Sequence, residues 1–341
     1  MNKEDIRIKH VIVHILDPTI GMPVLSDTEL EFGSEVAEFV REHIGKICAG
    51  DDAKECRFYE RESEVYRLLT GYEDENFVGI SQEIAGLLFE IMSGNIDIPP
   101  ADLMVARFRE GEEEYLALLK MNYKTLYTHR TMPLSEGEGN SNELIRHKSI
   151  LPSQTQRLTE AAVICLSDLS VQVVEKKYEV NGEKTDYFSF LFLKCSAHLS
   201  HKSKLSIVGR AVESVQKEGF AESERFEKQM RAKSIIQEEM EEKGGFVVEE
   251  IAEKIFEGEP ELRTAFQDKM EKYNMVRETI EPRSENTTRK FQSQHLFTDT
   301  GIEIKIPMEQ YKNPKCVEFI TNPDGTVSVL IKNIEHLEAK I

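Results

Sequence analysis

The sequence predicts an α+β protein, and two patterns lead to this prediction. In some segments apolar residues alternate with polar ones, which is typical of strands, and in others they recur every three or four residues, which is typical of helices. Along the 341 residues, strand patterns are first mixed with helix patterns, then give way to a purely helical stretch, and finally return. We therefore expect a mixed antiparallel sheet with helices, an all-helical segment and a small C-terminal antiparallel sheet.

Composition narrows the class of protein. Hydrophobic residues make up 40% of the chain and charged residues 31%, which suits a soluble protein with real cores. The five cysteines are widely spread, without a Cys-x-x-Cys pair, and favour reduced thiols in a cytosol. No long apolar run or signal-peptide pattern occurs, so we expect no membrane association. The formal charge of −19 argues against a protein that coats DNA unless basic residues gather on one face.

The N-terminal part carries most of the strand patterns. We expect helices after Ser34 and in two later stretches, the second ending at Gly94, and turns at Glu110-Gly111-Glu112 and Asn181-Gly182. Residues 133–142 resemble a loop. We assign residues 1–180 to an N-terminal α+β domain and 181–341 to a C-terminal domain. The expected strands span 6–16, 23–25, 103–108, 115–127, 145–151, 161–166 and 171–180.

The C-terminal part opens with an aromatic run, Tyr187 to Phe192, which could be a strand or the first turn of a helix. A helix pattern follows from Leu205. Residues 222–257 hold eleven acidic and six basic residues on helix patterns, and Pro260 opens a further helix. The tail predicts strands at 302–306, 316–321 and 326–331, with a turn at Pro323-Asp324-Gly325.

A basic turn between the aromatic run and the helix is the strongest candidate site. Residues 194–210 contain no acidic residue. Lysines at a helix N-terminus are unfavourable against the helix dipole, whereas a phosphate there would be bound by backbone N–H groups and lysine charge together. The alternative is a solvated turn that offsets nearby acids. The predicted nucleic-acid-binding residues are Lys194, His201, Lys202, Lys204 and Arg210.

Two other groups of residues suggest a metal site or a nuclease site, but a structural role explains each of them better. Cys195, His198 and His201 are zinc-ligand types, but a fourth ligand is not evident. Asp102, Glu112 and Lys120 surround a strand hairpin as in metal-dependent nucleases, yet Leu118 occupies the position where an acid is needed. No phosphate-binding glycine loop occurs. We predict no catalytic residues, no metal site and no cofactor.

Two further basic stretches are weaker candidates. Residues 120–130 interleave bases with Tyr123 and Tyr127, as in proteins that stack on single strands, but a partly buried strand explains them better. The other stretch comprises Arg146, His147, Lys148 and Arg157, in an expected loop. The acidic helices after 222 fit a solvated surface, or else a docking surface for a basic partner.

The layout resembles a bacterial family, the nucleoid-associated proteins typified by NdpA (YejK). The resemblance rests on Tyr187 and Phe190 before the basic turn, the helix from Leu205, and the tail GIEIKIPMEQYKNPKCVEFITNPDGTVSVLIKN. The opening strand with His10, followed by the helix from Ser34, also agrees. The resemblance implies a cytoplasmic protein on the nucleoid, with inferred binding to double-stranded DNA, self-association as a homodimer and links to type II topoisomerases. It brings no catalytic residues.

The leading hypothesis is a non-enzymatic nucleoid-associated protein that binds DNA or organises the chromosome. One alternative is an interaction protein that reaches DNA through partners such as type II topoisomerases. Another is a cryptic metal-dependent nuclease. Direct binding predicts affinity for bare duplex that falls steeply with salt.

Overall fold

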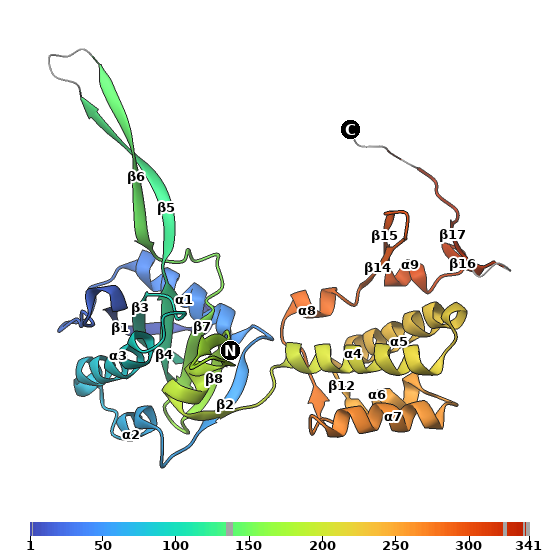
Figure 1. The fold of residues 1–341 in the computed structure, drawn as a ribbon, viewed down its shortest axis with the longest axis horizontal. Helices are drawn as coiled ribbons and strands as arrows, with labels where there is room; N and C mark the ends of the chain where they lie inside the picture. Colours follow the sequence, from blue (N-terminus) through green and yellow to red (C-terminus); the bar gives the residue numbers. More distant parts are fainter. Residues whose placement is uncertain (2, 134–138, 323–325, 337, 339–341) are drawn as a thin grey trace. The chain divides into compact units, whose positions relative to one another are not determined.

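The chain folds as two units, Met1–Ser200 and His201–Ile341. The computed structural model describes residues 1, 3–133, 139–322, 326–336 and 338 (Figure 1). The expected domain boundary at Val180 lies inside the first unit. Residues up to Ser200 belong there because the last short strand, β11 (Cys195–Ala197), pairs with β2 (Lys54–Phe58), which is far away in the sequence. The α+β class is confirmed.

A seven-stranded antiparallel sheet is the centre of the first unit. Its strand order is β1-β3-β4-β7-β8-β2-β11. The hairpin β3–β4 turns at Gly111, whose φ of 61° is readily adopted by glycine. The remaining strands of this sheet are β1 (Arg7–Leu16), β3 (Ala101–Glu110), β4 (Glu113–Asn122), β7 (Glu160–Cys165) and β8 (Ser170–Val174).

Helices cover both faces of this sheet. Because side chains of a strand alternate between faces, β4 contributes Leu116 and Leu118 to one core, and Ala117 and Leu119 to the other. The first core is closed by α2 (Glu64–Thr70) and α3 (Phe77–Ser93), and the second by α1 (Ser34–Cys48). The central strands are therefore apolar on both sides, which makes them the most continuous hydrophobic runs in the sequence.

The aromatic run forms a helical turn within the first core. Residues Phe188–Leu193 make a short π-helix, and Lys194 ends it with a φ of 48°. Tyr187, Phe188 and Phe192 are buried, whereas Phe190 is 60% exposed. The run is thus helix rather than strand, and its main role is packing.

Three of the expected strands differ from the structure. The long strand expected at 115–127 ends at Asn122, and a new strand, β5 (Lys124–Pro133), follows and pairs with β6 (Asn140–Ile150). The segment expected at 171–180 forms β8 and then β9 (Tyr178–Val180), which pairs with β10 (Glu183–Thr185) across the predicted Asn181-Gly182 turn. Val24 makes a single bridge to Ile15 rather than a strand.

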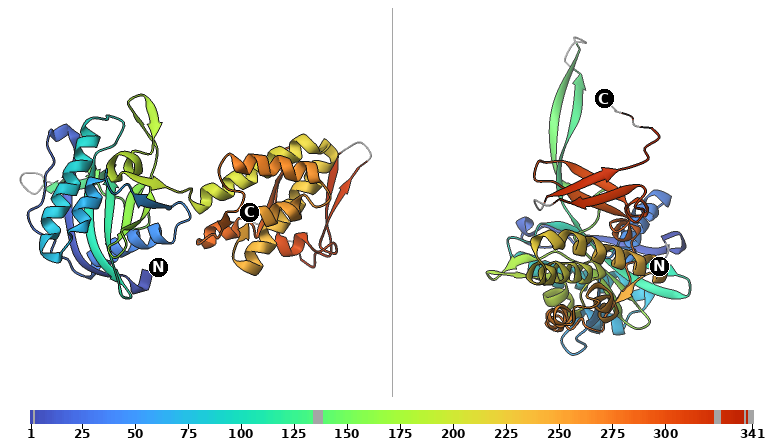
Figure 2. Two further views of the ribbon diagram at one scale, coloured as in Figure 1. Left: turned by 90° about the horizontal axis from the view of Figure 1, so that it is seen from below. Right: turned by 90° about the vertical axis from the view of Figure 1, so that its right-hand side faces the viewer.

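The second unit is a group of helices around an apolar core. Its helices α4 (His201–Gly219), α5 (Glu222–Lys243), α6 (Val248–Ile255) and α7 (Pro260–Glu271) pack side by side (Figure 2). The two-residue strands β12 (Phe246–Val247) and β13 (Thr279–Ile280) pair within it. None of the described helices is long and apolar enough to cross a membrane.

Two hairpins follow these helices. The first, β14 (Ser293–Phe297) with β15 (Glu303–Pro307), includes a strand that the sequence did not predict. The second, β16 (Val317–Thr321) with β17 (Val327–Ile331), agrees with the expected tail strands, and its predicted turn at Pro323-Asp324-Gly325 lies outside the described residues. The short helices α8 (Glu285–Arg289) and α9 (Met308–Tyr311) flank the first hairpin.

A buried histidine joins β1 to α3 in the first unit. His14 is fully buried, and its Nδ1 accepts a hydrogen bond from the Ser26 backbone N–H at 3.1 Å. The neutral ring therefore carries its proton on Nε2, which lies 3.0 Å from Ser81 Oγ. Burial lowers the pKa of His14 from 6.5 to about 4, because the charged ring would lose its hydration.

We predict that His14 makes stability depend on pH. Because its folded-state pKa lies below the unfolded value, its contribution is complete above pH 6.5 and is lost as pH falls toward 4. The unfolding free energy should drop by up to about 3 kcal/mol more in the natural chain than in His14→Gln. Urea titrations between pH 7.5 and 4.5 measure this difference. His43, whose pKa is also lowered to about 4 by burial, titrates equally in both proteins, so identical pH profiles would refute the prediction.

A buried ion pair links β4 to β7. Lys120 Nζ lies 3.8 Å from Glu160 Oε2, and both side chains are fully buried. The ammonium also donates to the Pro99 carbonyl at 3.1 Å, and Asn122 Nδ2 donates to Glu160 Oε2 at 2.6 Å. Despite the carboxylate, burial lowers the pKa of Lys120 to about 8. The two charges depend on each other, because neither is hydrated.

We predict that Glu160→Leu destabilises the first unit by about 3–5 kcal/mol, since it leaves the Lys120 ammonium buried without its counterion. Denaturant titration at pH 7 measures the loss. The matched control is Glu285→Leu, which removes the exposed partner of Arg289 and should cost less than about 1 kcal/mol. Equal effects of the two substitutions would contradict this interpretation.

Candidate nucleic-acid interface

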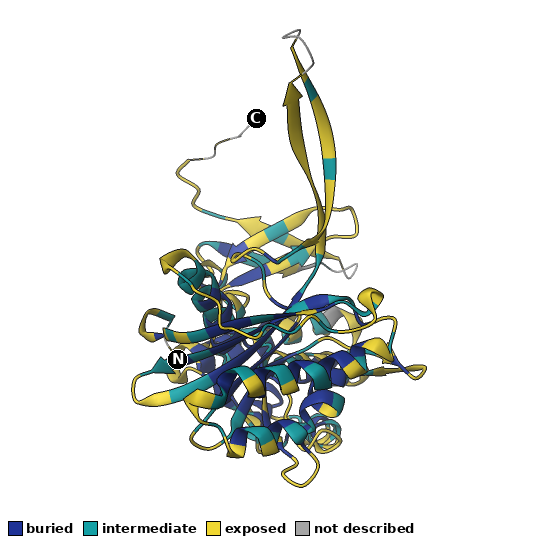
Figure 3. Cartoon of the chain, turned by 90° about the vertical axis from the view of Figure 1, so that its left-hand side faces the viewer, coloured by how far each residue is buried: buried dark blue, intermediate teal, exposed yellow. Residues whose placement is uncertain are grey.

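The most exposed element of the first unit is the ribbon formed by β5 and β6. Every residue of β5 is exposed, and most of β6 is exposed too, in contrast to the buried strands of the sheet (Figure 3). The ribbon projects away from the body of its unit (Figure 1). Large apolar side chains lie on its surface, with Leu126 52%, Tyr127 65% and Leu144 75% exposed. A two-stranded element with so little burial is supported by its base and its cross-strand pairs.

Tyr123 fixes the base of the ribbon. Its backbone N–H donates to the Pro100 carbonyl at 3.2 Å, and its hydroxyl donates to Asp102 Oδ1 at 2.5 Å. These contacts attach the chain to the start of β3 just where β4 ends. A register shift between Lys124 and Leu126 then marks a bulge, a feature that bends and twists a strand pair. The ribbon is therefore aimed by the sheet although it is not part of it.

Basic residues are concentrated in the part of the ribbon that we call the stem, residues 124–133 and 144–150. The stem contains four lysines or arginines and no acidic residue. The stem also contains His129 and His147. Between these two ranges the sequence holds three glutamates, of which Glu143 lies in β6 opposite Arg130. The four bases of the stem are Lys124, Arg130, Arg146 and Lys148.

The two faces of the stem each combine apolar and basic side chains. Residues that pair directly across antiparallel strands share a face. Tyr127 pairs with Arg146 and His129 with Leu144, so these four lie on one face. The other face carries Leu126 opposite His147, and beyond them Arg130 opposite Glu143. The first face thus offers the charge of Arg146 for phosphates and Tyr127 and Leu144 for bases or sugars, whereas on the second face Glu143 lies opposite Arg130 and offsets its charge.

The stem contrasts with the charge of its own unit. Residues 1–200 contain 21 lysines and arginines against 35 acidic residues. At about 3.3 Å per residue, Arg146 and Arg130 lie roughly 10–20 Å out along the ribbon. This is beyond the screening length of about 8–10 Å at physiological salt. A phosphate backbone at the stem would therefore be largely screened from the acidic body.

Both strands of the ribbon coincide with basic stretches that the sequence singled out as weaker candidates. For residues 120–130, the core interpretation holds for Lys120 and Met121, which are buried, and is wrong for Leu126 and Tyr127. Arg146, His147 and Lys148 lie in a strand rather than a loop, whereas Arg157 pairs with Asp52 at 3.2 Å. The signal that could have joined them was two acid-free strand patterns separated by a polar, glycine-containing segment.

The five predicted phosphate-binding residues are divided between the units. Lys194 belongs to the first unit, and the other four lie on α4 in the second. Lys202 is exposed, but Lys204 Nζ forms an ion pair with Glu278 at 2.5 Å, so its charge is largely offset. Arg210 Nε donates to the Ser206 carbonyl at 3.3 Å. Of the five, Lys202 and Arg210 are exposed, and the other three are half-buried.

The alternative chemical sites are not assembled by the described residues. Asp102 pairs across the hairpin with Met121, whereas Glu112 sits at its far turn, 95% exposed, beside Arg109. Lys120 is engaged by Glu160. Cys195 Sγ donates to the Ser189 carbonyl at 3.6 Å. Within the described part of the chain, no group of three or more His, Cys, Asp and Glu side chains is arranged to hold a metal ion.

Comparison with known proteins identifies the family. Residues 12–338 match the family model described as nucleoid-associated protein YejK. No curated protein matches the sequence. The match covers nearly the whole chain and confirms the resemblance seen in the order of its strands and helices. The chain therefore belongs to the family of the nucleoid-associated protein YejK.

Proposed function

We propose that this nucleoid-associated protein binds double-stranded DNA directly and that the stem of the ribbon makes the contact. The observation that carries the proposal is the exposed stem on an otherwise acidic unit. The residues of the stem include no acid, and Glu143, just outside its ranges, lies opposite Arg130. Bound DNA would release counterions from its phosphates, which is the main source of affinity for such proteins. The proposed role is chromosome organisation rather than catalysis.

The shape of the ribbon supports this proposal. The major groove of B-DNA is about 12 Å wide and admits a two-stranded β-ribbon. Arg146 or Arg130 could reach phosphates on either side of the groove, while Tyr127 and Leu144 contact the groove walls. Contacts to phosphates position a protein without reading sequence, so we expect weak base preference.

The alternative is that the protein reaches DNA through a partner. The family resemblance suggests type II topoisomerases as such partners, and on the same ground we propose that the protein is a cytoplasmic homodimer. The two mechanisms differ in one observable property. Direct contact predicts binding to bare duplex in the absence of any other protein, whereas recruitment predicts none.

We predict that Arg130→Glu with Arg146→Glu weakens duplex binding and flattens its salt dependence. Removing two phosphate contacts should reduce the slope of log affinity against log salt by about 2, because each contact releases about 0.9 counterions. Fluorescence anisotropy with a labelled duplex, at several salt concentrations, measures both quantities. Both residues are exposed, so the cores of the unit are untouched, and circular dichroism checks the ribbon, where Arg130→Glu lies opposite Glu143.

The control reverses two other arginines of the same unit. Arg57→Glu with Arg61→Glu changes net charge equally at exposed positions off the ribbon. It should lower affinity far less and leave the slope nearly unchanged. If both pairs weaken binding to the same degree, net charge rather than the stem governs affinity. If the natural chain does not bind duplex at all, direct binding is wrong.

The basic residues of α4 give a separate prediction. Lys202→Glu tests this group best, because Lys202 is exposed whereas Lys204→Glu would also break the ion pair with Glu278. If α4 contributes a phosphate contact, Lys202→Glu should reduce the salt slope by about 1 in the same assay. An unchanged slope would exclude Lys202 from the interface. A larger effect than that of the ribbon pair would move the main contact to α4.

A further inference from the structure

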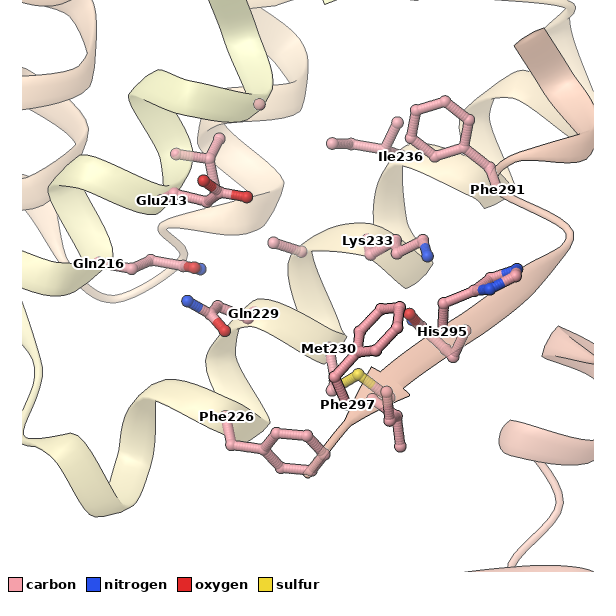
Figure 4. Close-up of a pocket in the computed structure, with 15 residues that line it drawn as sticks. Glu213, Gln216, Phe226, Gln229, Met230, Lys233, Ile236, Phe291, His295 and Phe297 are labelled. Atoms are coloured by element: carbon pink, nitrogen blue, oxygen red, sulfur yellow. The ribbon is translucent and has the colours of Figure 1, made fainter. Parts of the chain in front are cut away.

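The helical part of the second unit contains a groove. It is a cavity of about 480 Å³ lined by α4, α5 and β14. Figure 4 shows Gln216 and Gln229 pointing toward each other from the two helices. Phe226, Met230 and Phe297 lie close together where α5 meets β14. A volume of this size accommodates a few side chains or a short peptide segment.

One wall of the groove is the open edge of a strand. Among the described residues, β14 pairs only with β15. The Gln292 carbonyl accepts a hydrogen bond from the Met308 N–H, and the Thr298 N–H donates to the Ile302 carbonyl. The backbone N–H and C=O groups of the even-numbered residues of this strand therefore point toward β15. The odd-numbered residues therefore turn their backbone groups to the other side, and Lys233 Nζ indeed donates to the Ser293 carbonyl there at 3.0 Å. The backbone groups of His295 and Phe297 face that same side.

Two buried glutamine side chains of the groove each keep one amide atom without a hydrogen-bond partner among the described residues. Gln216 is 1% exposed, and its Nε2 donates to the Lys228 carbonyl at 3.0 Å, which fixes the orientation of the amide. Its Oε1 has no hydrogen-bond partner among the described residues. Gln294 is 2% exposed, and its Nε2 is likewise without one. Unpaired buried polar atoms cost about 1–3 kcal/mol each, so a ligand that pairs with them gains affinity.

The rest of the lining defines the chemistry of the occupant. Phe297 is 72% exposed although it is aromatic, and with Phe226 and Met230 it forms an apolar wall. Glu213 is the acidic residue of the lining and has no ion-pair partner among the described residues, whereas the Lys233 ammonium is occupied by Ser293. The groove thus favours an apolar ligand with an adjacent positive charge.

We infer that this groove binds an extended peptide segment of a partner protein, which adds to β14 as a third strand. An extended peptide supplies N–H and C=O groups at the spacing of the open edge, and it offers both the donor and the acceptor that the two glutamines lack. Its apolar side chain packs against Phe226, Met230 and Phe297. A neighbouring lysine or arginine lies near Glu213. This site does not depend on DNA binding.

Selection from displayed random peptides of about eight residues, with the full-length chain as bait, tests the inference. Enriched peptides should combine apolar residues at alternate positions with a basic residue. A synthetic peptide of the enriched sequence should bind the natural chain, and Phe297→Asp should weaken it at least tenfold by losing the apolar wall. His295→Pro removes one outward N–H without touching the pairs with β15, and should weaken binding roughly tenfold.

The matched control is Tyr273→Asp, which replaces an exposed aromatic residue of the same unit outside the groove and should leave affinity unchanged. If His295→Pro does not fold, Phe297→Asp alone decides. The inference is overturned if no peptide is enriched, or if the peptides bind Phe297→Asp as well as the natural chain. Ultracentrifugation supplies a further test. If the natural chain forms a dimer that Phe297→Asp dissociates but that added peptide does not dissociate, the groove is occupied by a second copy of the chain and the inference is overturned.

Discussion

Burial of both faces of β4 is the constraint on which the first unit depends. Leu116 and Leu118 pack toward α3, and Ala117 and Leu119 pack toward α1. A register slip by one residue would exchange these two sets and separate Lys120 from Glu160, which would leave two charges buried without partners. Packing and electrostatics therefore specify the same register. That register in turn determines where β4 ends and in which direction the chain leaves the sheet.

The position of the ribbon depends on where the chain leaves the sheet at the end of β4. The helices cover the sheet as far as Asn122, and Tyr123 anchors the next residues to Asp102. Beyond that point every residue of β5 is exposed, so the same alternation that buries β4 places Leu126 and Tyr127 in solvent. Placing the bases on this uncovered ribbon separates them from the acidic body, which explains how an acidic protein can hold a surface suited to phosphate.

Local patterns predicted the elements well, and non-local contacts account for what was missed. The helices α1, α3 and α4 and the tail hairpin follow directly from periodicity and turn residues. Alternation alone cannot distinguish a buried strand from an exposed one, which is why Tyr127 was assigned to a core. The boundary between the units depends on the pairing of β11 with β2, and the charge of Lys204 is offset by an ion pair with Glu278. Both contacts join residues that are distant in the sequence. The strand β14 is short and half polar, so its pattern was too weak to detect.

The acidity of the first unit has a consequence for crowding on a chromosome. A copy held by its ribbon would carry an acidic body alongside the duplex, and the next copy would bring another. The acidic bodies of neighbouring copies would repel each other, especially at low ionic strength. Occupancy would then be self-limiting, with copies spread sparsely instead of forming a continuous sheath. On the proposed binding mode, most of the duplex would stay accessible to other proteins.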